Sequence, residues 1–299
     1  MKIVAIDIGG TAIKYGLVDG EGGVKDSSSL LTEASKGVDQ LLEKIYFIVE
    51  KFQKIDGIAV SATGQIDGKI GKVVGGTDLI PGWIGTNLVD ILERKYNVPA
   101  VLENDVNCAA LGEMWKGAAR EKDNFLCLTI GTGIGGGIVL NKELLRGEGS
   151  VAAEFGHIQI ERDGDECGCG KKGCYQNYAS TTALLKMAEK EFGRKINGKE
   201  LFDYFYLDDK KAKKIIYRWV DYLTDGLATL IYIFNPTLIV IGGGVSSQGE
   251  SLNRIISTFL EKKVMKNYLD ILNIKMAERG NDAGMIGASY LLIEKIKRK

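Results

Sequence analysis

The chain of 299 residues has only three prolines, one histidine and no excess of either charge, with 39 Lys and Arg against 39 Asp and Glu. Nucleic-acid binders usually carry a basic face or tail, so the zero net charge argues against a nucleic-acid partner. No segment approaches the ~18 apolar residues of a membrane span, and we expect no membrane partner. The 45% hydrophobic and 26% charged content is instead ordinary for a globular protein.

The N-terminal segment lacks a developed signal region, because Asp7 and Gly9–Gly10 interrupt it after a few apolar residues. We therefore expect a cytoplasmic protein. In that reducing compartment, five cysteines favour metal binding or chemistry over disulfides.

Strand patterns alternate with helix patterns along the chain, which is typical of α/β architecture. At roughly 150 residues per domain, the length indicates two domains, which we expect at 1–118 and 119–299. We expect a last helix at about 284–296 that packs back on the N-terminal domain. The expected strands are 2–8, 13–18, 57–61, 98–102, 125–130, 137–140 and 238–241, and the expected helices before the last are 39–52, 87–96, 105–116 and 219–234.

Three glycine turns each follow an apolar strand, at Asp7–Thr11, Gly131–Gly137 and Gly242–Gly244. Without Cβ atoms, such turns let backbone N–H groups converge on phosphate oxygens. The chain contains neither GxxxxGK[ST] nor a GxGxxG that opens a helix with an acid about 20 residues later. From the turns alone, phosphate binding and purely structural hairpins both stay open.

The acidic segment Glu103–Asn107 lies where an expected strand ends and a helix begins. Phosphoryl transfer to a hydroxyl requires a base near the hydroxyl proton, and a carboxylate here is suited to that role. The same carboxylate is also explained as a helix cap.

The single histidine belongs to a cluster of potential metal ligands, formed by His157, Cys167, Cys169 and Cys174. Three thiolates and one imidazole within 18 residues are the full ligand set of a closed zinc site, and a site without an open position is structural. A redox cluster or incidental loop cysteines are the alternatives. Cys108 and Cys127 lie in apolar patterns and are expected in the core.

The segments 7–14, 128–137 and 242–244 resemble, in order and spacing, the phosphate and adenosine motifs of ROK sugar kinases. The resemblance implies two actin-like (ribonuclease H-like) ATPase domains with an interdomain cleft that binds ATP. It also implies that Asp7 orients the Mg²⁺ shell through water. The implied nucleotide-binding residues are Asp7, Gly9, Gly10, Thr11, Lys14, Gly131, Thr132, Gly133, Gly135, Gly243 and Gly244.

The segment 103–107 resembles the ENDxN motif of the same family, which implies that Asp105 is the base and Asn104 a sugar ligand. Segments 154–157 and 167–174 resemble its ExGH and CxCGxxGC motifs. These imply sugar contacts from Glu154 and His157 and a structural Zn²⁺. The family commonly has a glutamate where this chain has Gln176, which still offers an acceptor to a sugar hydroxyl. The loops 61–67 and 75–86, with Thr77, fall where the family places sugar-facing backbone.

The resemblance therefore implies a cytoplasmic, ATP-dependent kinase of a hexose-type sugar, with phosphorylation at the 6-hydroxyl and assembly as a homo-oligomer, a dimer. Glucose, β-glucosides and N-acetylmannosamine are the leading substrates. The alternative is a ROK-type sugar-sensing protein without catalysis. Repressors of the family carry an N-terminal DNA-binding module, and the phosphate turn at Asp7 leads us to expect none here. A mechanical or chaperone ATPase of the actin-like type has no reason to carry the sugar and cysteine motifs.

Overall fold

The computed structural model describes residues 1–76 and 79–298 as an α/β protein, which confirms the predicted fold class. Contacts divide the chain into two units. The first contains Met1–Asp123, Gly137–Ala152 and Glu278–Lys299, and the second contains Asn124–Gly136 and Ala153–Ala277. The predicted domain boundary at 118/119 stays a prediction. Among the described residues, no helix is long and apolar enough to cross a membrane.

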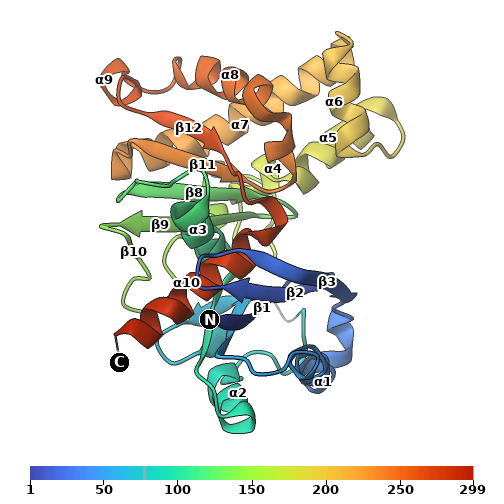
Figure 1. Ribbon diagram of the computed structural model, residues 1–299. Helices are drawn as coiled ribbons and strands as arrows, with labels where there is room; N and C mark the ends of the chain where they lie inside the picture. The colour runs from blue at the N-terminus through green and yellow to red at the C-terminus, as the bar shows by residue number, and fades with distance from the viewer. Residues whose placement is uncertain (77–78, 299) are drawn as a thin grey trace. The chain divides into compact units, whose positions relative to one another are not determined.

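The first unit is built on a five-stranded sheet of order β3-β2-β1-β4-β7 (Figure 1). Strands β1, β4 and β7 are parallel, and β2 and β3 join them as antiparallel neighbours. Every residue of β4 is buried, as expected for a parallel strand that is covered on both faces. Its elements are β1 (Lys2–Ile8), β2 (Ala12–Asp19), β3 (Val24–Leu31), η1 (Ala34–Lys36), α1 (Gly37–Glu50), β4 (Gly57–Ala62), β5 (Gln65–Asp67), β6 (Lys72–Gly75), α2 (Leu88–Tyr96), β7 (Ala100–Asn104), α3 (Asp105–Lys116), η4 (Gly280–Asp282) and α10 (Ala283–Lys297).

The register of the parallel strands aligns polar residues at one edge of this sheet. Asp7 of β1 lies opposite Ser61 of β4, and Ser61 lies opposite Glu103 of β7. Ligands of open α/β sheets bind outside the carboxyl ends of the strands. The segment that follows Glu103 therefore begins at the edge where chemistry is expected.

Helix α10 packs directly on α3 within the first unit (Figure 1). The contact is close because both helices carry glycine there. A Cβ at Gly287 would lie 1.8 Å from the carbonyl oxygen of Cys108, and a Cβ at Gly112 would lie 2.3 Å from that of Ala283. The α3–α10 contact thus has no room for a methyl group at either position.

Replacing Gly287 by Ala should lower the free energy of unfolding by roughly 1–3 kcal/mol or more, because the added methyl overpacks a backbone-to-backbone contact. Gly198→Ala is the matched control, since a Cβ there meets nothing within 4 Å and alanine favours the helix. Thermal melts of both variants check this. Equal melting temperatures would contradict the close packing of α3 and α10.

The second unit contains most of a second five-stranded sheet, of order β10-β9-β8-β11-β12. Strands β8, β11 and β12 are parallel, and β11 is fully buried. Helix α8 packs on β12 and on α7. The elements of this part of the chain are β8 (Phe125–Ile130), β9 (Ile134–Leu140), β10 (Glu143–Leu144), η2 (Phe155–His157), α4 (Gln176–Ala179), α5 (Thr181–Phe192), α6 (Gly198–Tyr206), α7 (Lys210–Phe234), β11 (Leu238–Gly242), η3 (Gly244–Gln248), α8 (Gly249–Leu260), α9 (Lys266–Leu269) and β12 (Asn273–Met276).

Two predicted boundaries are wrong. The glycine segment 131–137 is not one loop, because β9 already begins at Ile134. A Cβ at Gly136 would lie 2.2 Å from the carbonyl oxygen of Ala153, so this glycine serves a close approach inside a strand. Helix α7 begins at Lys210 and not near residue 219, because Asp209 caps it through the N–H of Ala212.

Candidate active site and metal cluster

The turn between β1 and β2 is fixed by hydrogen bonds. The N–H of Gly9 donates to the carbonyl of Ala12, and the Thr32 hydroxyl donates to the carbonyl of Gly9. Among the described residues, the N–H groups of Gly10 and Thr11 donate to no backbone carbonyl of this turn. Two adjacent N–H groups in a hairpin turn are suited to phosphate oxygens.

Asp7 is held beside this turn by three other segments of the first unit. The Ser61 hydroxyl donates to its Oδ1 at 2.6 Å, and Lys14 lies opposite it in β2. The Lys14 ammonium in turn donates to Oδ1 of Asn281 at 2.9 Å. A Cβ at Gly284 would lie 2.8 Å from Asp7 Oδ1. Burial raises the pKa of Asp7, although the Ser61 hydrogen bond and the Lys14 charge oppose the shift.

The junction of β7 and α3 fixes one oxygen of Asp105. Asn104 caps α3, because its Oδ1 accepts from the N–H groups of Val106 and Asn107. Its Nδ2 donates to Asp105 Oδ1 and to the carbonyl of Gly64. Asp105 Oδ1 also accepts from the N–H of Val106 at 2.9 Å. No described residue donates a hydrogen bond to Oδ2, so this oxygen stays available as an acceptor.

The sequence leaves open that a carboxylate of this segment caps the helix. In the structure the side-chain amide of Asn104, and not the carboxylate of Asp105, caps α3. Asn104 uses two acceptor and two donor positions within the protein, which is close to its full capacity. A sugar hydroxyl that binds Asn104 has to replace one of these bonds, and the bond to Gly64 is the one outside the helix cap.

Burial, together with the negative charge of Asp7, raises the pKa of Asp105 to about 7. Hydrogen bonds from Val106 and Asn104 oppose the shift but do not cancel it. A general base is most effective when its pKa lies near the working pH. The environment of Asp105 meets that condition.

We expect the turnover of the acceptor sugar to fall below pH 7, because only the carboxylate form of Asp105 accepts a proton. At saturating Mg-ATP, kcat/KM should decrease by roughly tenfold per pH unit on the acidic side of a pKa of about 7. ADP release measured across the pH range checks this. An inflection near the ordinary value of 3.8 would contradict the raised pKa.

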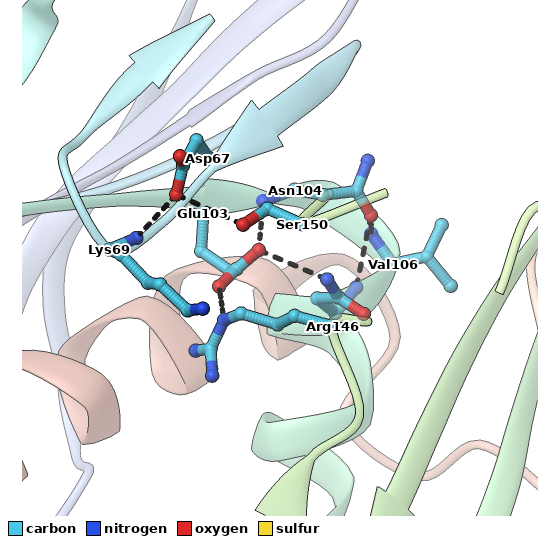
Figure 2. Close-up of polar contacts among 8 residues, drawn as sticks. Asp67, Lys69, Glu103, Asn104, Val106, Arg146 and Ser150 are labelled. Atoms are coloured by element: carbon cyan, nitrogen blue, oxygen red, sulfur yellow. Dashed lines mark hydrogen bonds and ion pairs between the residues drawn. The ribbon is translucent and has the colours of Figure 1, made fainter. Parts of the chain in front are cut away.

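The buried Glu103 forms an ion pair with the partly buried Arg146 next to Asn104 (Figure 2). Arg146 Nε lies 2.7 Å from Glu103 Oε2, and Glu103 is 1% exposed. The other oxygen, Oε1, accepts from the Asn104 N–H and from Nδ2 of Asn107. Sequence patterns give no signal for Arg146, which is 43 residues from Glu103. The pair positions the start of α3.

In the second unit, the turn at Gly131–Gly133 is fixed from several sides. The Gly131 N–H donates to the carbonyl of Gly133, and the Thr181 N–H donates to the carbonyl of Gly131. Ser180 caps α5 at this point. Among the described residues, the N–H groups of Thr132 and Gly133 have no backbone acceptor in the turn. Gly135, expected in the phosphate loop, lies in β9.

The turn after β11 requires glycine. Gly243 has a φ of 86°, and a Cβ there would lie 2.2 Å from the carbonyl oxygen of Ile130. The chain therefore passes directly over the end of β8, where Gly242 lies opposite Thr129. Gly244 follows as the first residue of η3.

The structure brings together the four predicted metal ligands. The ligand atoms of His157, Cys167, Cys169 and Cys174 all lie within 4.8 Å of one another. Cys167 Sγ is 3.8 Å from His157 Nδ1, and Cys169 Sγ is 3.6 Å from Cys174 Sγ. With Zn–S bonds of about 2.3 Å, tetrahedral ligands are separated by nearly these distances, so the donor set fits Zn²⁺. Gly173 (φ 71°) provides the tight turn before Cys174.

Gln176 contacts this cluster. Its Nε2 donates to Cys167 Sγ at 3.4 Å, and a Cβ at Gly133 would lie 2.6 Å from its Oε1. Burial acts to raise the pKa of the Cys167 thiol, but hydrogen bonds from Cys169, Gln176 and Cys174 lower it to about 6. The amide therefore supports a thiolate and lies beside the turn at Gly131–Gly133.

Glu154 directly precedes η2 and His157 is its last residue, with His157 Nε2 4.0 Å from Glu154 Oε2. Since Nδ1 faces the sulfurs, Nε2 is the nitrogen left to donate. Both side chains are exposed. Thr77, expected near the sugar, lies outside the described residues.

Known proteins resemble this chain along almost its whole length. A beta-glucoside kinase of Listeria monocytogenes is 37% identical over 308 residues, covering 100% of this chain and 99% of that protein. A glucokinase of Thermotoga maritima is 31% identical over 313 residues, covering 99% and 98%. The crystal structure of a ROK family glucokinase from Streptomyces griseus with glucose and AMPPNP matches with a TM-score of 0.86 and 31% identity, covering 98% and 100%.

The fold, the strand-end turns and these relatives define the class of protein, a carbohydrate kinase. The family model described as the ROK family matches residues 3–295, and the chain belongs to this family. The predicted family resemblance is thereby confirmed.

Proposed function

We propose that this protein transfers the γ-phosphoryl group of ATP to the 6-hydroxyl of a hexose-type sugar, of the glucose, β-glucoside or N-acetylmannosamine class. The observation that carries the proposal is the carboxylate of Asp105, with one oxygen fixed, the other available and a pKa of about 7. The sugar hydroxyl transfers its proton to Asp105 while its oxygen bonds to the γ-phosphorus. The bond to the β-phosphate oxygen breaks, and ADP leaves.

The nucleotide is assigned to the three glycine turns. Phosphates accept N–H groups at Gly9–Thr11 and Gly131–Gly133, with Lys14 and Gly135 beside them, and the adenosine packs on Gly243–Gly244. Mg²⁺, when bound, neutralises charge on the transferred phosphoryl group, and Asp7 holds its water shell. The Streptomyces griseus relative binds the ATP analogue AMPPNP together with glucose, which supports ATP as the donor.

The sugar is assigned to Asn104, Asp105, Glu154, His157 and Gln176. Zn²⁺ at His157, Cys167, Cys169 and Cys174 orders the loop that carries Glu154. The cluster takes no part in proton or phosphoryl transfer, because four protein ligands leave no open position. The predicted homodimer and cytoplasmic location stay predictions, and light scattering after size-exclusion chromatography tests the dimer.

A substrate panel tests the proposal. We expect ADP release from Mg-ATP with one class among free hexoses, N-acetylhexosamines and β-glucosides, and little release without sugar. Glucose or a β-glucoside is the first expectation, because the named relatives are a glucokinase and a beta-glucoside kinase. Failure of every sugar, with zinc in place, would favour the sensing protein without catalysis.

A further inference from the structure

A cavity of about 470 Å³ lies within the first unit, on the side of Glu103 that carries Arg146. Leu102, Leu111 and Leu144 contribute apolar walls, and Lys69 and Arg146 contribute cations. The volume is within the range of small-molecule sites, which are typically apolar with a few convergent polar groups. None of the nucleotide or sugar assignments above uses this cavity.

Most charges around the cavity are already neutralised by partners. Lys142 pairs with Asp123, Lys295 with Glu93, and Arg298 with Glu143, while the lining acid Glu294 pairs with Lys297. These pairs leave little net charge at the rim.

Lys69 is the exception, and Arg146, although it pairs with Glu103, keeps unused donors. Arg146 bonds Glu103 through Nε alone, so its two terminal nitrogens have no partner among the described residues. The Lys69 ammonium has no acid within ion-pair distance in the described part of the chain. Figure 2 shows both side chains on the same side of Glu103, whose own oxygens are occupied. A guanidinium edge and an ammonium that face one cavity favour an anion with several acceptor oxygens, since the acid beside them, Glu103, already has its oxygens engaged.

We propose that this cavity binds a phosphate monoester with an apolar body, with its phosphate between Lys69 and Arg146 and its body against the leucine walls. A phosphate monoester carries about −1.5 to −2 charges at neutral pH and three strong acceptor oxygens, which can accept from both cations. The Arg146 guanidinium also pairs with Glu103, and Glu103 accepts a hydrogen bond from the Asn104 N–H. We therefore expect a ligand in the cavity to affect the conformation at the start of α3 as well.

Phenyl phosphate is the probe, measured by isothermal titration calorimetry with saturating Mg-ADP present to occupy the nucleotide site. We expect Lys69→Ala to weaken binding by roughly tenfold, the loss of one charge-assisted contact. The matched control Lys186→Ala, an exposed lysine on α5 that does not line the cavity, should leave the affinity unchanged. Inorganic phosphate and benzoate should each bind at least roughly tenfold more weakly, since one lacks the apolar body and the other the second charge.

Hydrogen–deuterium exchange locates the site without using activity. Phenyl phosphate should increase protection at residues 68–71, 100–104 and 142–146. The proposal is overturned by no binding at millimolar probe, by equal affinity in Lys69→Ala, by equal binding of inorganic phosphate or benzoate, or by loss of binding when Mg-ADP is added. None of these outcomes depends on which sugar the kinase uses.

Discussion

Asp105→Asn should abolish turnover while both substrates still bind. The amide cannot accept the hydroxyl proton, and loss of a general base typically lowers kcat by roughly 10²–10⁴-fold. The side-chain oxygen is retained, so the acceptor for the Val106 N–H remains. Steady-state kinetics give kcat, and calorimetry gives the affinities for ATP and sugar, which we expect to change little.

The thermal stability of Asp105→Asn distinguishes loss of the base from misfolding of the variant. The pKa of Asp105 is raised on folding, so its protonated form is favoured in the folded state, and the resulting stability is lost as pH rises through about 7. At pH 8, the neutral variant should therefore melt no lower than the wild type. Asp39→Asn is the matched control, an exposed aspartate in the first turn of α1, and should keep full activity. Wild-type turnover in Asp105→Asn would refute the assignment of the base.

Cys174→Ala should remove the metal and weaken sugar binding. The thiol is buried in the four-residue cluster, and a closed zinc site that loses one of four ligands loses most of its affinity. The zinc content measured by elemental analysis should fall from about one zinc per chain to near zero. The KM for sugar should rise by roughly tenfold or more, because Glu154 loses its ordered loop, while the affinity for ATP stays near that of the wild type.

Cys127→Ala provides the control for the loss of a buried cysteine. Cys127 lies in β8 of the same unit and outside the cluster, so that variant should be less stable but keep its zinc. An unchanged zinc content in Cys174→Ala, or a wild-type protein purified without zinc, would reject the metal assignment.

The local parts of the site could be predicted from the sequence. The strand–turn patterns at Asp7–Thr11 and at 128–133 depend on neighbouring residues only, and so does the junction at Glu103–Asn107. The cysteine spacing likewise limits the cluster to a short loop. These features placed the candidate residues at strand ends, where the register of β1, β4 and β7 aligns them.

Contacts between distant segments could not be predicted in this way. Arg146 reaches Glu103 across 43 residues, and Ser61 reaches Asp7 across 54. Each pair depends on the order of strands in the sheet and on the conformation of the loops. The hydrophobic periodicity of the sequence indicates neither. The contact of Gln176 with Cys167 arises similarly, because the cluster folds back on the start of α4. The glycines of β9 predict a loop from the sequence alone, because a close backbone approach and a turn both select glycine.

Phosphorus NMR of the reaction mixture tests the central claim most directly. Wild-type protein with Mg-ATP and the sugar selected by the panel should yield ADP and a sugar monophosphate in equal amounts, and Asp105→Asn should yield neither. ADP with inorganic phosphate and no sugar phosphate, or equal product from the Asp105 variant, would contradict the account.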